Sequence, residues 1–117
     1  MARFAIVAAK ARDDRCVGQV GLVLAGQPSG NAQGLYWLLP EARGSSWAAE
    51  ALQLVSDWAF ESLGIQRVGL LVDLDNLASQ RTAEKAGFTR EGVLRGYEHL
   101  PRRGRVDVWS FSRLASD

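Results

Sequence analysis

Hydrophobic and polar positions in the first third of the chain follow the short period of β-strands. Three stretches are apolar or alternate between apolar and polar residues, and turn-forming residues bound them: Arg3 to Lys10, Val17 to Ala25 and Gln33 to Leu39. Pro40 ends the third stretch, because proline has no N–H to donate to a strand ladder. We therefore expect three successive strands.

The spacing of apolar residues changes after Pro40 from the strand period to the longer helical period. Apolar residues then recur at three- and four-residue spacing, which predicts an amphipathic helix from Ser46 to Leu63. They are Ala48, Ala51, Leu52, Val55, Trp58, Ala59 and Leu63. Gly64 follows at the position where a helix commonly ends in the left-handed conformation.

Strand-like alternation returns from Arg67 to Val72. A second helix is predicted between Asn76, a favourable N-cap, and Ala86, with Gly87 as its stop.

Two further strands are expected at the C-terminal end, Thr89 to His99 and Arg105 to Leu114, with a hairpin turn at Pro101 to Gly104. The order is therefore three strands, helix, strand, helix and two strands. It predicts a single α/β domain of the α+β type over residues 1–117, with a mixed, mostly antiparallel sheet.

Composition narrows the functional classes. A net charge of +1 argues against a general nucleic-acid or membrane-surface binder. With Cys16 as the sole cysteine and His99 as the sole histidine, neither an internal disulfide nor a metal site is expected. The chain shows no signal-peptide pattern and no apolar run of the roughly 20 residues that a membrane span needs, so we expect a soluble cytoplasmic protein.

The turn before the first helix has the residues of an anion site. Arg43 is followed by Gly44 and two serines, and then by the helix start. Free N–H groups and the helix dipole favour an anion there, and small residues let phosphates approach the backbone. This turn alone does not separate a phosphate site from an ordinary entry into a packed helix.

Two stretches taken together, residues 34–44 and 75–88, resemble the acyl-CoA-binding core of the GCN5-related N-acetyltransferase (GNAT) superfamily, in particular its RimJ/RimL-like ribosomal-protein N-acetyltransferase subgroup. Arg43 and Ala48 match the ends of the family's pyrophosphate-binding pattern, whereas Ser46 stands where glycine is usual. Serine keeps the N–H donor but adds a Cβ, which disfavours a positive φ.

The resemblance implies that acetyl-CoA is the co-substrate. Its pyrophosphate would bind Arg43, Gly44, Ser45, Ser46, Trp47 and Ala48. Its pantetheine arm would contact Asn76 and the backbone of Leu38 and Leu39, where the third strand splays from the strand Arg67 to Val72.

The resemblance also implies catalytic roles. Ser79 would assist the leaving thiol, and Glu98 would act as the base toward the acceptor amine. Many family members carry a tyrosine where this chain has Ala83. From the residues alone, a helix cap and a first-turn polar residue are the commoner roles for Asn76 and Ser79, and a solvated strand carboxylate is the preferred role for Glu98.

Alternatives remain open about substrate and activity. The acceptor would be a protein N-terminus or a small amine. Family members normally begin with another strand and one or two helices, so the resemblance implies a truncated GNAT fold whose exposed flank favours a homodimer. The rival hypothesis is a non-catalytic GNAT-derived module that binds CoA or another ligand, or a dimeric interaction protein. A nucleic-acid binder using Arg102, Arg103 and Arg105 is disfavoured by the net charge.

Overall fold

The described part of the chain forms six strands and two helices in the order that the sequence predicts. A computed structural model describes residues 2–7, 16–24, 30–38 and 46–117. The elements are β1 (Ala2–Val7), β2 (Cys16–Leu24), β3 (Asn31–Leu38), α1 (Trp47–Ser62), β4 (Arg67–Asp73), α2 (Leu77–Lys85), β5 (Thr89–Leu100) and β6 (Gly104–Leu114). The predicted α+β fold class and element order are confirmed.

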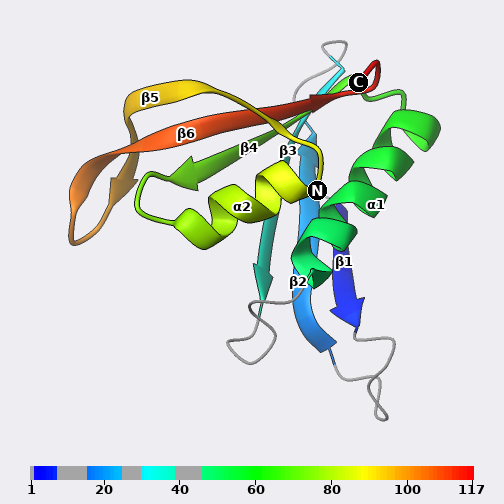
Figure 1. Cartoon of the computed structure of the whole chain (residues 1–117), viewed down its shortest axis with the longest axis horizontal. Helices are drawn as coiled ribbons and strands as arrows, with labels where there is room; N and C mark the ends of the chain where they lie inside the picture. The colour runs from blue at the N-terminus through cyan, green and yellow to red at the C-terminus, as the bar shows by residue number, and fades with distance from the viewer. Residues whose placement is uncertain (1, 8–15, 25–29, 39–45) are drawn as a thin grey trace.

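All six strands belong to one mixed sheet with the order β1-β2-β3-β4-β6-β5. The β3–β4 pair is parallel, and the other four pairs are antiparallel. The predicted hairpin is confirmed as β5–β6, whose ladder closes with Leu100 opposite Gly104. Figure 1 shows that β3 and β4 point in clearly different directions, so the sheet divides into a β1–β3 half and a β4–β6 half.

The two helices cover the same face of the sheet. Helix α1 packs on β1, β2 and β3, helix α2 packs on β4 and β5, and the two helices contact each other. Small and branched residues of α1 are buried against this face, among them Ala49, Leu52 and Ala59. Trp58 and Leu63, which the helical pattern also placed on the apolar face, lie at its edge and are 38% and 40% exposed.

Local signals set the helix ends. Gly64 and Gly87 have φ values of 67° and 91°, so both predicted helix stops are left-handed. At the start of α2, the Asn76 side chain accepts a hydrogen bond from the backbone N–H of Ser79 at 3.1 Å, which confirms the predicted N-cap.

Candidate active site

Strands β3 and β4 are paired over only three residues each, from Asn31–Arg67 to Gln33–Gly69. Beyond Gln33, β3 continues to Leu38 with β2 as its partner, and beyond Gly69, β4 continues to Asp73 with β6 as its partner. The splay implied by the sequence resemblance is therefore present, and Figure 1 shows the two strands separating. Among the described residues, the edge of each strand that faces the gap has no strand partner, which leaves backbone groups available to a ligand.

A close contact marks the point where the strands part. Gly34 follows the last paired residue of β3, and Leu70 follows the last paired residue of β4. A Cβ on Gly34 would lie 2.9 Å from Cδ2 of Leu70, whose side chain is only 2% exposed. Glycine at this position therefore lets a buried leucine lie directly against the backbone of the splayed strand.

Tyr36 connects the splayed strand to the first turn of α2. Side chains alternate along β3, so Tyr36 lies on the helix-covered face, as do the buried Ala32 and Gly34. Its ring packs against the core, and its Oη is hydrogen-bonded to Oγ of Ser79. Ser79, a residue singled out from the sequence, thus has a phenol as its partner.

Sequence reasoning missed Tyr36, although the strand pattern held a signal. A tyrosine on the inward face of a strand needs a partner for its hydroxyl. Ala83, where the resemblance places a tyrosine in other family members, is completely buried. In this chain the phenol near the start of α2 therefore comes from β3.

A buried glutamine holds the loop that leads into α2. Gln80 is 5% exposed, and its Nε2 donates to the carbonyl oxygen of Leu74 at 2.9 Å and to that of Asp73 at 3.4 Å. Its Oε1 accepts a hydrogen bond of 3.0 Å from Arg90, whose guanidinium stacks 4.4 Å from the centroid of the Trp109 ring. These contacts fix the helix start that carries Ser79.

The β5–β6 hairpin also contacts this loop. Arg103 forms ion pairs with Asp73 at 3.0 Å and with Asp75 at 3.3 Å. The backbone N–H of Asp75 and the guanidinium of Arg103 lower the pKa of Asp73. The Arg103 side chain is 51% exposed, and its two carboxylate partners lie about thirty residues earlier in the chain. Arg102 and Arg105 are exposed.

Glu98 lies on β5, opposite Val106 of β6, and is exposed. Within residues 46–117, no hydrogen bond or ion pair joins Glu98 to Ser79. Its role as a base stays a prediction.

The start of α1 is described from Ser46 onward. Ser46 has a φ of −86°, so the residue that replaces the usual glycine does not need the left-handed conformation. Its side chain makes no cap hydrogen bond to the helix; instead Oγ accepts a hydrogen bond of 2.9 Å from Nζ of Lys85, at the end of α2. An ammonium group therefore lies beside the helix N-terminus.

The other predicted coenzyme contacts are placed only in part. Trp47 is half-buried against the core, and Ala48 is buried in the first turn of α1. Leu38 ends β3, where its backbone lies on the splayed segment. Leu39, Arg43, Gly44 and Ser45 lie outside the described residues.

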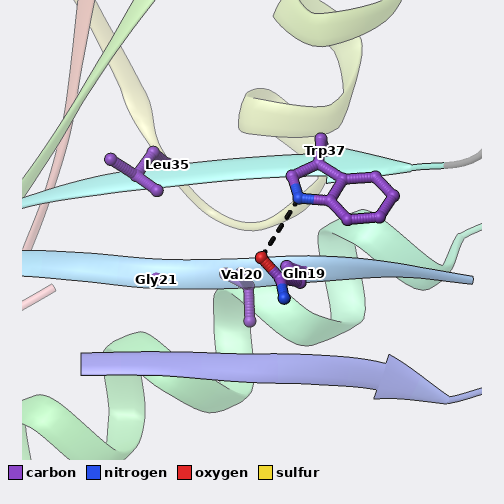
Figure 2. A pocket seen from close by; sticks show the side chains of 5 residues that line it. All are labelled: Gln19, Val20, Gly21, Leu35 and Trp37. Carbon is purple, nitrogen blue, oxygen red and sulfur yellow. Dashed lines mark hydrogen bonds between the residues drawn. The ribbon is translucent and has the colours of Figure 1, made fainter. Parts of the chain in front are cut away.

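A small pocket lies on the opposite face of the sheet. Leu35 and Trp37 alternate with Tyr36 on β3, and with Gln19 and Gly21 of β2 they line a hollow of ≈210 Å³ that also touches Val20 (Figure 2). The indole N–H of Trp37 donates to Oε1 of Gln19 at 3.2 Å. None of these side chains is charged, and the hollow is separated from the Tyr36–Ser79 pair by the sheet itself.

Two further observations concern only the part of the chain that the structure describes. That part contains no group of three or more histidine, cysteine, aspartate or glutamate residues arranged to hold a metal ion. Neither α1 nor α2 is long and apolar enough to cross a membrane.

Comparison with known proteins gives consistent results. A family model described as an acetyltransferase (GNAT) domain matches residues 1–89. The protein named uncharacterized N-acetyltransferase YoaA, from Bacillus subtilis, is 37% identical over 81 residues, which cover 69% of this chain and 46% of YoaA. The protein named uncharacterized N-acetyltransferase p20, from Bacillus licheniformis, is 34% identical over 113 residues, which cover 96% of this chain and 61% of p20. The chain thus spans about half of one relative and three-fifths of the other.

A solved structure supports the same assignment. RimJ from Mycobacterium smegmatis, in complex with CoA-disulfide, superposes with a TM-score of 0.80 at 25% identity, over 89% of this chain and 50% of the RimJ chain. The family match covers most of the chain, and the observed fold contains the splayed strands implied by the sequence resemblance. The chain belongs to the GNAT family of acetyltransferases.

Proposed function

We propose that this chain binds acetyl-CoA and transfers its acetyl group to a primary amine, as an N-acetyltransferase. The observation that carries the proposal is the splay of β3 from β4 beside the Ser79 hydroxyl. GNAT proteins use acetyl-CoA as their co-substrate, and RimJ, a structural neighbour, was solved with a CoA derivative bound.

The open edge of β3 suits the pantetheine arm of acetyl-CoA. Residues 34–38 have β2 on one side, and none of the described strands lies on the other. An extended ligand with amide groups can occupy such an edge as an added strand, through main-chain hydrogen bonds. We assign Leu38 and Leu39 to this contact. Asn76 would contribute its Nδ2, because its Oδ1 already caps α2.

The diphosphate of the coenzyme would bind at the start of α1. The first-turn N–H groups of a helix and its dipole favour an anion. Lys85 places a further positive charge at Ser46. The residues assigned to this contact are Arg43, Gly44, Ser45, Ser46, Trp47 and Ala48.

The chemistry requires an acid and a base. A neutral amine must attack the thioester, so its proton goes to a base, to which we assign Glu98 directly or through water. The departing thiolate takes a proton from the Ser79 hydroxyl. The acceptor class is a protein N-terminus or a small amine.

The proposal is tested by the thermal unfolding of the purified chain with acetyl-CoA, followed by an assay of thiol release with amine acceptors. At about 100 times its dissociation constant, the coenzyme should stabilise the chain by about 2.7 kcal/mol. Stabilisation without thiol release for any acceptor would favour the non-catalytic CoA-binding module instead. The absence of any stabilisation at millimolar acetyl-CoA would contradict both the proposed acetyltransferase and the CoA-binding module.

A further inference from the structure

We propose that Tyr36 is a positioning residue that acts through Ser79: it orients the Ser79 hydroxyl and replaces the proton that this hydroxyl gives to the departing thiolate. This inference rests on the acetyl-transfer function proposed above and adds a residue to it. It assigns a role to a tyrosine on β3, an element otherwise expected to contribute only backbone contacts.

The geometry favours a relay rather than a chance contact. Tyr36 and Ser79 are 43 residues apart, and their hydroxyl oxygens are hydrogen-bonded at the helix-covered side of the splay. The Tyr36 ring packs against the core, which holds its hydroxyl at the first turn of α2. The capping bond of that turn joins the backbone N–H of Ser79 to Asn76. The serine hydroxyl is therefore not used as a cap, and Tyr36 sets its orientation.

The acidities of the groups explain why a serine needs this partner. An aliphatic hydroxyl is a poor acid, because an alkoxide is far more basic than a thiolate. An ordinary phenol has a pKa of about 10, close to the value of about 8.5 for a cysteine thiol. Proton transfer is efficient when donor and acceptor are matched in this way. A phenol behind the serine therefore provides the acid that the serine alone lacks.

The proton balance closes without another reagent. The neutral amine nitrogen forms a bond to the thioester carbonyl carbon, and the C–S bond breaks with its electron pair on sulfur. Sulfur takes the proton of the Ser79 hydroxyl, and the Ser79 oxygen takes the proton of Tyr36. The proton lost by the amine nitrogen returns through solvent to the Tyr36 phenolate. The net products are an amide and the free thiol of CoA.

The test is a double-mutant cycle with Tyr36→Phe, Ser79→Ala and the pair, measured by thiol release. Tyr97→Phe is the matched control, because Tyr97 is the second of the two tyrosines and is 55% exposed on β5. Tyr36→Phe should lower kcat about a hundredfold, near the lower end of what a positioned general acid contributes, with KM for acetyl-CoA within about twofold. Adding Ser79→Ala to Tyr36→Phe should then lower kcat by less than about a further twofold, because both residues serve the same proton-transfer step.

The split between kcat and KM separates proton supply from simple support of the fold. Tyr36→Phe should lower kcat alone, while its midpoint of thermal unfolding stays near that of Tyr97→Phe. A wild-type kcat in Tyr36→Phe, or single-mutant effects that multiply fully in the double variant, would overturn the inference and leave the proposed function standing. A wild-type chain that releases no thiol would instead contradict the proposed function.

Discussion

Gln80 connects the fold to the candidate site, and its replacement by alanine is the most informative test of that connection. The substitution removes the donor to Leu74 and the acceptor for Arg90, at 2.9 and 3.0 Å. It leaves the helical backbone unchanged, because alanine is the best helix former. The substitution therefore removes the hydrogen-bonded link between the β4–α2 loop, α2 and β5, together with the packing of a buried side chain.

The expected magnitude follows from the type of each hydrogen bond. A neutral bond such as the one to Leu74 contributes about 0.5–1.5 kcal/mol, and a bond to a charged group such as Arg90 about 1.5–3 kcal/mol. Arg90 keeps its ion pair with Glu84 at 2.8 Å, and its side chain is 37% exposed, so water can replace part of the loss. We therefore expect a net destabilisation of about 2 kcal/mol.

Thermal unfolding gives the corresponding observable. An unfolding entropy of about 2.1 cal/mol/K per residue amounts to about 0.25 kcal/mol/K for a chain of 117 residues. A loss of about 2 kcal/mol then lowers the midpoint by about 8 °C. The matched control is Gln53→Ala on α1, because that side chain is exposed and makes the same change on a helix. A midpoint for Gln80→Ala equal to that of the control would refute the reasoning about this buried network.

Two further predictions concern the sheet. Two hydrogen bonds from Arg67, at 3.0 and 2.7 Å, are the main cause that lowers the pKa of Glu91 from 4.5 to about 2. The pair therefore contributes stability that is fully present above pH 4.5 and is lost as the pH falls through about 2. Because these side chains are 35% and 38% exposed, we expect the pair to contribute about 1 kcal/mol to the free energy of unfolding. Unfolding measured across pH should show the loss of this contribution in the wild type but not in Glu91→Gln. Parallel pH curves for the two proteins would contradict the prediction. Gly34→Ala should destabilise by about 1–3 kcal/mol in denaturant unfolding, because its Cβ would meet the buried Leu70. Gly69→Ala, whose tightest contact would be the end of the Gln33 side chain at 3.2 Å, should destabilise the fold less, and equal destabilisation would argue against the close contact at the splay.

The order of elements could be predicted because each boundary has a local cause. The strand period of two and the helix period of 3.6 are distinct in this chain, and Asn76 and Gly87 act on the neighbouring backbone. The hairpin at Leu100 and Gly104 is local as well. Such signals are complete within a few residues, so they can be interpreted without knowledge of the tertiary structure.

The site contacts could not be predicted in the same way. The partners of Arg103 are carboxylates 28 and 30 residues earlier, whereas no carboxylate adjoins it in the sequence Pro101 to Arg105. Similarly, Gln80 lies in a polar stretch of a short helix, and nothing local indicates that it is buried. Each of these depends on packing between elements that are distant in sequence.

The splay explains why the open strand edge and the hydroxyl pair occur together. If the β3–β4 ladder continued beyond Gln33 and Gly69 in the same register, Tyr36 would lie beside Val72 and both strand edges would be paired. The pantetheine arm would then have no free backbone to bind, and the Tyr36 hydroxyl would be held at β4 instead of at Ser79. Because the strands part immediately after three paired residues, one feature provides both the ligand edge and the contact with α2. A variant that closes the gap should therefore lose coenzyme binding and proton supply together, whereas Tyr36→Phe should lose only the second.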